Sequence, residues 1–336
     1  MSLDDKLPAA LKAEAPSPFL PGTSVQFAWD SVSLTSFLSC PRQYQYRILE
    51  GRVPSNPSFA IALVFGIQFH TGMELYHKER AKGFDHQQAV FTTVKLLLAS
   101  PHTASLPRDE DIDQMASNLD DLDDGITYRN SRTRTVYHLI RAVVWYLDQY
   151  ENDPLQTHIL ANGLPAVELS FRLPLPGVDV AGQPLILCGH IDRVVDFNGF
   201  LHPSDYKTTK SISRQFFEMF DLSHQLTGYI TAGQAILEHP MKSAIVDAIA
   251  LQVGGVKFGR HFSHRSAGHL SEYARLLSHV SWLAQHYAEQ SYYPMNTSAC
   301  YFCEYKGVCA QTPTARERVL NLHWKKAPGW NPLQNR

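Results

Sequence analysis

A predicted hairpin in the middle of the chain brings three charged side chains together. Residues 187–195 and 201–207 are predicted strands, and the segment between them contains Asn198-Gly199, a pair typical of tight hairpin turns. Pairing of the two strands would place Asp192 close to Asp205. Because residues two apart in a strand share a face, Asp205 and Lys207 would point into the same site.

Two interpretations of this hairpin are open. Carboxylate oxygens bind hard divalent cations, and an adjacent lysine can orient a nucleophilic water or stabilise the charge that develops on a phosphate. Alternatively, the hairpin is a polar edge of a sheet, and its charged residues form a surface ion pair of the kind common in strands. The hairpin alone does not decide between a metal-dependent hydrolase and an ordinary polar surface.

The pattern along the rest of the chain predicts an α/β fold. We expect a central mixed β-sheet flanked by helices, because predicted strands and helices alternate in the second half of the chain. Ser33 is the expected cap of the first helix, and Pro41 is expected near a helix start or a kink. The predicted helices are 33–48, 59–82, most of 84–160, 213–237 and 270–290, and the predicted strands are 166–173, 185–197, 200–207 and 244–254.

Composition narrows the class of protein without identifying it. The 336 residues contain no apolar run long enough to cross a membrane, and the N-terminus lacks the basic and apolar regions of a signal peptide. Five cysteines scattered over a long chain argue against a disulfide scaffold and for metal or cluster ligation in a reducing compartment. We therefore expect a cytoplasmic protein without a membrane partner.

Charge is segregated along the chain, although the formal net charge is only −2. Residues 109–124 carry eight acidic side chains and no lysine or arginine, and three arginines follow within 129–134. The arginines of 129–134 and the basic residues of 257–265 are candidate contacts for a polyanion. Residues 1–24 are expected to form a flexible N-terminal arm and residues 313–336 a basic C-terminal tail.

Three of the five cysteines form a tight cluster near the C-terminus. Cys300, Cys303 and Cys309 have the spacing Cys-x2-Cys-x5-Cys, which is rarely accidental. Three thiolates do not complete a tetrahedral site, and Cys40, followed by a proline, is the natural fourth ligand. Cys188 lies in an apolar strand and is expected in the core. On chemistry alone, four cysteines fit zinc and an iron–sulfur cluster equally well.

Four further residues are unremarkable one by one. His70 lies on a predicted helix after Gly66, and Glu168 lies on a predicted strand between apolar neighbours. Gln225 and Tyr229 are four residues apart on the helix that follows the hairpin, so they share a face. Each pattern alone is equally typical of a surface or core position.

The order of these motifs resembles a known family. The chain carries, in sequence, Cys40, Gly-x3-His70, Glu168, Gly-x-Ile-Asp192, Asp205-x-Lys207, Gln225-x3-Tyr229 and Cys300-x2-Cys303-x5-Cys309. This series is similar to the RecB-like branch of the PD-(D/E)XK nucleases, and more narrowly to its iron–sulfur members, the AddB nuclease domain and the CRISPR-associated RecB-like exonucleases. The resemblance extends over about residues 31–312. Residues 84–165 match no motif of the family.

The resemblance implies one nuclease domain over residues 25–312, with a restriction-endonuclease-like core, a helical insertion at 84–165 and a cysteine cluster at 300–309. In such a domain Mg²⁺ or Mn²⁺ would be bound by Asp192 and Asp205 with help from His70 and the carbonyl of Tyr206. Glu168 would reach the metal through water, Lys207 would position the attacking water or stabilise the phosphate, and Gln225 and Tyr229 would buttress the site or contact DNA. The ligands of a [4Fe–4S] cluster, or of zinc as the lesser alternative, would be Cys40, Cys300, Cys303 and Cys309.

The implied activity is hydrolysis of phosphodiester bonds in DNA repair, recombination or replication. An exonuclease acting on single-stranded DNA or duplex ends is expected, with a helicase or recombination protein as a possible partner chain. A non-catalytic DNA-binding module that keeps the fold and the cluster is the alternative. A zinc deaminase does not fit, because its signature needs His-x-Glu and a proline before the first cysteine, whereas this chain has His190-x-Asp192 and Ala299 before Cys300.

Overall fold

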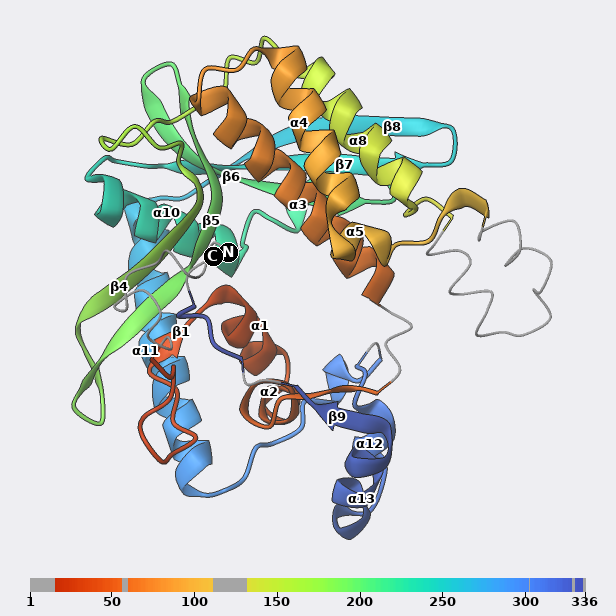
Figure 1. The fold of residues 1–336 in the computed structure, drawn as a ribbon. Coiled ribbons are helices and arrows are strands. Elements are labelled where there is room, and N and C mark those ends of the chain that lie inside the picture. Colours follow the sequence, from red (N-terminus) through yellow and green to blue (C-terminus); the bar gives the residue numbers. More distant parts are fainter. Residues whose placement is uncertain (1–15, 56–59, 111–131, 302, 328–329, 335–336) are drawn as a thin grey trace, which may run out of the picture. The chain divides into compact units, whose positions relative to one another are not determined.

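The protein folds into two compact units, each built from segments that are distant in the sequence (Figure 1). The computed structural model describes residues 16–55, 60–110, 132–301, 303–327 and 330–334. Unit 1 consists of Met1–Ser55, Ser170–Gly189 and Glu272–Arg336, and unit 2 consists of Asn56–Leu169 and His190–Ser271. Most of the predicted acidic segment 109–124 and Arg129 lie outside the described residues.

Unit 2 contains a mixed sheet, which confirms the predicted α/β class. Strand β6 (Phe200–Thr209) pairs antiparallel with β5 (Gln183–Phe197) and parallel with β7 (Ser243–Gln252). Strand β8 (Gly255–His264) pairs antiparallel with β7, and the short strand β3 (Gln156–Thr157) pairs with the end of β5. All residues of β7 except the last are buried, as expected for a strand covered on both faces.

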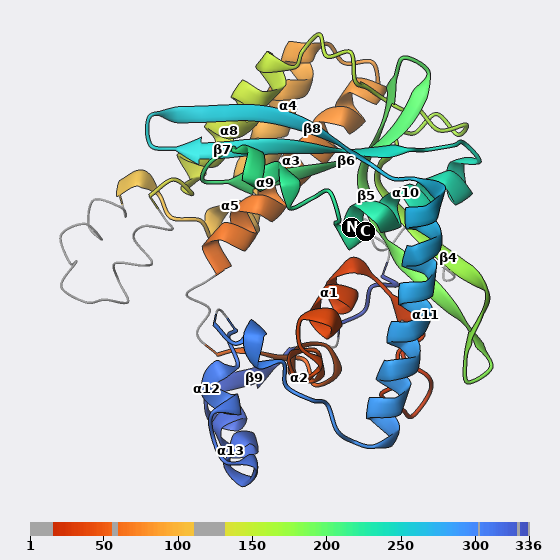
Figure 2. The same cartoon turned by 180° about the vertical axis from the view of Figure 1, so that it is seen from behind.

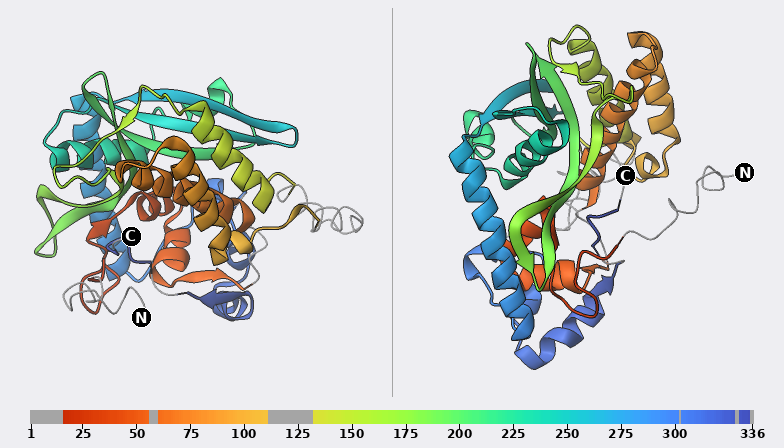
Figure 3. Two further views of the ribbon diagram at one scale, coloured as in Figure 1. Left: turned by 45° about the horizontal axis from the view of Figure 1, so that its top comes forward. Right: turned by 90° about the vertical axis from the view of Figure 1, so that its left-hand side faces the viewer.

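Helices cover both faces of this sheet (Figure 3). One layer consists of α3 (Ala60–Ala81), α4 (His86–Ala99), α5 (Pro101–Ala104) and α8 (Val136–Gln149). Phe69 of α3 and Leu139 of α8 are fully buried in the core that this layer forms with Tyr206 of β6. The opposite face carries α9 (Arg214–Glu218) and α10 (His224–Leu237) (Figures 2 and 3).

The turn between β5 and β6 has the predicted form. Phe197 pairs with Phe200, so Asn198 and Gly199 alone connect the strands. Both residues have positive φ, 53° and 80°, which matches the twist of a two-residue hairpin and explains the Asn-Gly pair. The Gly199 amide donates to Asp196 Oδ1 at 2.9 Å.

Unit 1 surrounds the N-terminal helices with the C-terminal part of the chain. Its elements are β1 (Ala28–Trp29), α1 (Ser31–Ser39), α2 (Pro41–Tyr44), a π-helical turn (Gln45–Leu49), β2 (Arg52–Pro54), most of β4 (Val167–Val180), most of α11 (Ala267–Glu289), a 3-10 turn (Thr297–Ala299), α12 (Lys306–Cys309), α13 (Pro313–His323) and β9 (Trp324–Lys326). Strand β1 pairs parallel with the first half of β5, and β2 pairs antiparallel with β9. Helix α1 lies beside α11, where Phe37 stacks on Tyr287 (Figure 2).

The last described residues of the chain pack against its beginning. Leu333 is buried with Ala28 and Cys188, and Trp330 Nε1 donates to Asp30 Oδ1 at 3.2 Å. The segment predicted as a basic tail therefore includes a helix, a strand and a core residue. None of the helices in the described segments is both long enough and apolar enough to span a bilayer.

Two local predictions were wrong. Asp30, not Ser33, caps α1, and Ser33 returns the hydrogen bond as the third residue of a capping box. The predicted helix 213–237 is interrupted at 219–223, where Ser223 starts α10 with its own cap. Residues 255–264 form β8, a strand for which no prediction was made.

Candidate active site

The two hairpin aspartates lie on paired strands of unit 2. Arg193 of β5 pairs with Ser204 of β6, which brings the neighbouring Asp192 and Asp205 to the same level of the sheet. The Tyr206 amide donates to Asp192 Oδ2 at 3.4 Å, across the two strands. Asp205 is fully buried. A buried carboxylate needs compensation by positive charge or hydrogen bonds.

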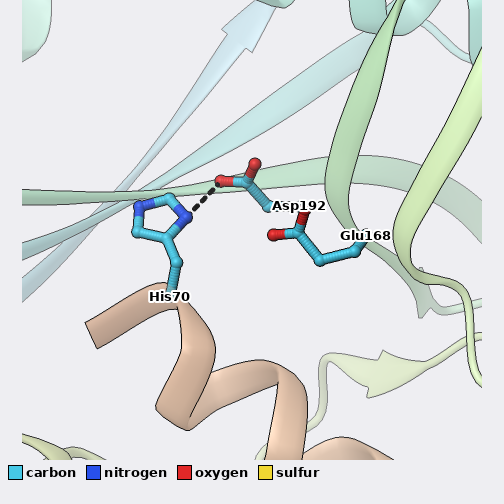
Figure 4. Close-up of side chains that lie close together, drawn as sticks. All are labelled: His70, Glu168 and Asp192. Atoms are coloured by element: carbon cyan, nitrogen blue, oxygen red, sulfur yellow. Dashed lines mark ion pairs between the residues drawn. The ribbon is translucent and has the colours of Figure 1, made fainter. Parts of the chain in front are cut away.

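His70 projects from α3 toward Asp192 (Figure 4). Its Nδ1 lies 3.1 Å from Asp192 Oδ2, and its Nε2 lies 2.8 Å from the carbonyl oxygen of Tyr206. Burial disfavours the charged imidazole, but the carboxylates of Asp192 and Asp205 outweigh it and raise the pKa of His70 to about 9. The ring is therefore an imidazolium that donates from both nitrogens.

Glu168 completes a group of three potential metal ligands. One ligand atom each of His70, Glu168 and Asp192 lies within 4.8 Å of the others, and the Glu168 side chain points toward Asp192 (Figure 4). Glu168 has a φ of 46°, the left-handed region that side chains other than glycine avoid. Such a conformation costs on the order of 1–2 kcal/mol and persists only where the surrounding structure fixes it.

Lys207 links Asp205 to helix α10. Its Nζ lies 2.5 Å from Asp205 Oδ2 and donates to Gln225 Oε1 at 3.0 Å. Gln225 Nε2 donates to the Tyr229 hydroxyl at 3.0 Å, and that hydroxyl is 3.5 Å from Asp192 Oδ1. Because Asp192 and Asp205 lie beside each other on neighbouring strands, the five side chains are arranged as a ring.

The two carboxyl groups differ in proton affinity. Burial raises the pKa of Asp205 to about 7, since the Asp192 charge adds to the effect and Lys207 only partly offsets it. Burial acts in the same direction on Asp192, but the charge and hydrogen bond of His70 outweigh it and lower that pKa. For Lys207, the two carboxylates overcome burial and raise the pKa, so its ammonium group stays charged.

The donor set fits a hard divalent cation. Carboxylate oxygens with one imidazole nitrogen suit Mg²⁺ or Mn²⁺ rather than a thiophilic ion. Asp205 Oδ1 is buried and has no hydrogen-bond donor among the described residues, so it can still accept a ligand or a water. Asp205 was expected to bind the metal directly and Glu168 through water, and these roles remain predictions. The group of close ligand atoms includes Glu168, while Asp205 Oδ2 lies against Lys207.

A buried ion-pair network behind the site was not predicted. Asp247 of β7 lies beside Tyr206 in the register of the sheet and is fully buried. Arg260 of β8 donates to Asp247 Oδ1 at 2.7 Å, to Asp153 Oδ1 at 2.7 Å and to the Tyr146 hydroxyl at 3.0 Å. A single aspartate within the apolar strand 244–251 was the available signal.

This network also corrects an expectation about the basic segment 257–265. Arg260 is committed to two carboxylates, and Arg265 is buried with five hydrogen bonds to neighbouring oxygens. These two arginines are therefore structural rather than free to bind a phosphate backbone. Lys257 is exposed.

In unit 1, the two cysteine-bearing segments lie together. Cys40 precedes Pro41 at the start of α2, and the Asn296 amide donates to Cys40 Sγ at 3.4 Å. The main-chain carbonyl oxygen of Asn296 in turn accepts a hydrogen bond from the Cys300 thiol at 3.7 Å. Burial raises the pKa values of Cys303 and Cys309, and the charge of Cys40 contributes to both shifts. Cys303 and Cys309 thus lie close enough to Cys40 for its charge to affect their proton affinity.

The fifth cysteine is separate from this cluster. Cys188 is 1% exposed, and its thiol donates to the Trp29 carbonyl at 3.5 Å. Burial raises its pKa well above the usual range, as expected for an inert core thiol.

Comparisons with known proteins identify a family. A family model described as the PD-(D/E)XK nuclease superfamily matches residues 31–310. A search of curated proteins found no match. Among solved structures, one titled "Crystal structure of SSO0001" is similar to this chain, with 14% sequence identity and a TM-score of 0.32. The match covers 66% of this chain and 93% of the chain in that structure.

Proposed function

Because the chain belongs to the PD-(D/E)XK nuclease superfamily, we propose that it is a metal-dependent deoxyribonuclease that uses Mg²⁺ or Mn²⁺. The observation that carries this proposal is the ring of Asp192, Tyr229, Gln225, Lys207 and Asp205, with His70 and Glu168 beside it. An ordinary surface ion pair is a poor explanation, since Asp205 is buried and Lys207 is largely covered.

In the proposed mechanism, some residues of the candidate active site bind the cation and others position the water and the phosphate. His70, Glu168 and Asp192 would hold the cation, and the main-chain carbonyl of Tyr206 lies next to them. The bound cation supplies Lewis acidity, which neutralises charge on the phosphate and acidifies a bound water. Loading it requires His70 to give up the proton that faces Asp192, because a nitrogen ligand must have a free lone pair.

Lys207 acts as a fixed cation and not as a base. Two carboxylates raise its pKa, so Nζ remains protonated and can donate to the attacking water or to a phosphate oxygen. Gln225 Oε1 holds Nζ in place by accepting a hydrogen bond from one of its three N–H groups. Asp205 Oδ1, which lacks a donor among the described side chains and amides, is available to accept from the water.

We further propose exonucleolytic action on single-stranded DNA or duplex ends, in repair, recombination or replication. This finer assignment is supported by the motif order shared with the RecB-like branch, whose members often work beside a helicase or recombination protein. The chain has no Gly-x4-Gly-Lys-Ser/Thr phosphate-binding motif, so a partner chain would supply any ATP-driven unwinding.

The test is degradation of single- and double-stranded DNA, labelled at the 5′ or the 3′ end, with Mg²⁺, Mn²⁺ or EDTA. We expect cation-dependent cleavage that Asp205→Ala and Lys207→Ala each abolish. Glu272→Ala and Lys95→Ala, which remove exposed charges elsewhere, are the matched controls and retain activity. Equal activity of the Asp205 variant and the wild type would refute the proposal. DNA binding without cleavage would favour the alternative of a non-catalytic DNA-binding module.

The four clustered cysteines are proposed to bind a [4Fe–4S] cluster. Cys303 and Cys309 pack against a small apolar core that includes Tyr46 and Tyr305, a setting that shields such a cluster from solvent. Four thiolates also suit a tetrahedral zinc ion, which is the alternative.

The cluster is tested on protein purified without oxygen. We expect a brown protein with broad absorbance near roughly 400 nm. Cys300→Ala is expected to lose the colour and to unfold at a lower temperature, because the centre joins two segments about 260 residues apart in the chain. Cys188→Ala keeps the iron and is the control. Colourless protein with one bound zinc would refute the cluster and leave the nuclease proposal standing.

A further inference from the structure

Arg265, the residue directly after β8, is buried and uses its whole guanidinium group. It is 6% exposed. Nε donates to Thr227 Oγ1 at 2.7 Å, and Nη1 donates to Ser263 Oγ and to the His264 carbonyl, both at 2.8 Å. Nη2 donates to the carbonyls of Phe220 and Ser223, at 3.1 and 3.3 Å. A guanidinium has five N–H bonds, and all five have an acceptor here.

The position is unfavourable for a positive charge. No carboxylate within the described segments forms an ion pair with Arg265, and its burial lowers the pKa of the guanidinium. It also lies at the N-terminus of α10, where the helix dipole already presents positive charge. Apolar residues of similar volume often stabilise a fold at least as well as a buried charged side chain does. A buried arginine is therefore expected where its hydrogen-bond geometry is needed.

Three of the five acceptors define the start of α10. Phe220 lies in the turn between α9 and α10, Ser223 is the helix cap, and Thr227 is in the first turn. The Ser223 side chain accepts from the Leu226 amide at 3.4 Å, as a cap does. Arg265 therefore fixes both the axial position and the rotation of the first turn relative to the edge of the sheet.

The same turn carries the α10 residues of the candidate active site. Gln225 is the second residue of the helix, and Tyr229 follows one turn later on the same face. Their partners, Lys207 and Asp192, are on β6 and β5. A small rotation of the first turn would break the contact of Gln225 with Lys207, because a hydrogen bond weakens steeply with distance and angle.

We propose that Arg265 is a positioning residue of the nuclease site, which acts through the first turn of α10 on Gln225 and Tyr229. The expected effect on the cleavage rate rests on the proposed function. The expected effect on the order of the first turn rests on the geometry alone. The remainder of α10 is held independently by buried apolar residues, among them Ile230 and Ala232, so the helix remains docked without the arginine.

The structural consequence is tested by hydrogen exchange of the backbone amides in the wild type, Arg265→Met and Arg265→Lys. Methionine keeps much of the volume, and lysine keeps the charge but has three donors on one atom. We expect exchange of the amides in 224–229 to accelerate at least about tenfold in both variants, with no change in β7. Unchanged exchange in 224–229 would overturn the inference, whether or not the protein cleaves DNA.

The kinetic consequence is tested by a double-mutant cycle with Gln225→Ala/Tyr229→Phe. Removal of a residue that orients an active-site group commonly lowers activity 10–100-fold, and we expect such a loss in kcat for Arg265→Met, with KM for DNA within about twofold. In the Gln225→Ala/Tyr229→Phe background the same substitution is expected to cost less than about threefold. An equal loss in both backgrounds would show a purely structural role and overturn the proposal.

Two controls separate the possible failures. Leu139→Ala removes a buried side chain of α8 and lowers stability without changing a residue of α10. This variant shows how much destabilisation alone reduces kcat. A wild-type protein that does not cleave DNA with either cation would refute the proposed function. The exchange experiment would then still decide whether Arg265 orders the first turn.

Discussion

Replacement of Asp205 by asparagine is expected to stabilise the metal-free protein while abolishing cleavage. The carboxyl group is fully buried, and its pKa of about 7 lies roughly three units above the value of about 3.9 for an unfolded chain. The folded state therefore binds a proton more tightly than the unfolded state. Stability falls as the pH rises from about 4 to about 7, and the full cost is present above that range.

The magnitude follows from the two pKa values. At 1.36 kcal/mol per unit, ionisation of Asp205 costs the fold about 4 kcal/mol at pH 8 and about 1–2 kcal/mol at pH 5. Asparagine resembles the protonated carboxyl and escapes this cost. The attraction between Lys207 and the Asp205 carboxylate is already included, because it lowers the pKa of Asp205 and so reduces the cost. The stability difference between variant and wild type should therefore grow by about 2–3 kcal/mol from pH 5 to pH 8.

The assay is urea unfolding in EDTA at pH 5, 6, 7 and 8, followed by far-ultraviolet circular dichroism. Glu272→Gln, which neutralises an exposed carboxylate, is the control and should differ little from the wild type at every pH. Addition of Mg²⁺ or Mn²⁺ should stabilise the wild type more than Asp205→Asn. A difference between Asp205→Asn and the wild type that is flat across this range would refute the reasoning about burial and charge at the site.

Other variants test other parts of the structure. Tyr229→Phe removes the hydroxyl beside Asp192 and is expected to lower kcat several-fold at an unchanged melting temperature; a wild-type rate would show that this link of the ring is dispensable. Asp30→Ala removes the cap of α1 and is expected to cost about 1–2 kcal/mol in urea unfolding; no loss would contradict the capping role. Arg260→Met leaves Asp247 buried without its partner and is expected to cost about 3–5 kcal/mol, and Asp247→Asn in addition should recover part of it.

The sequence predicted structure correctly where a local pattern, such as a turn pair or a helical spacing, allowed only one conformation. The Asn198-Gly199 turn fixed the register of the hairpin, and the register then placed Asp192 beside Asp205. The spacing of Gln225 and Tyr229 put both side chains on one helical face, and the structure brings that face to Lys207. These inferences needed only the periods of strands and helices.

Other features depend on contacts that no local pattern encodes. Ser33 looked like a helix cap, but the capping side chain is Asp30, three residues earlier, which also accepts a hydrogen bond from the distant Trp330. Arg265 looked like a free basic residue, and only the tertiary structure shows that its donors are all used. The left-handed backbone at Glu168 likewise could not be predicted, since glutamate rarely adopts it.

The discontinuous construction of unit 1 has a consequence for biosynthesis. Asp30 contacts Trp330, Ala28 packs against Leu333, and β2 pairs with β9, so the N-terminal part of the unit completes its packing only when residues beyond 320 have been made. Every residue of unit 2 has been made once the ribosome reaches Ser271. The N-terminal helices therefore remain incompletely packed during most of translation, which leaves apolar surface of the nascent chain exposed to aggregation.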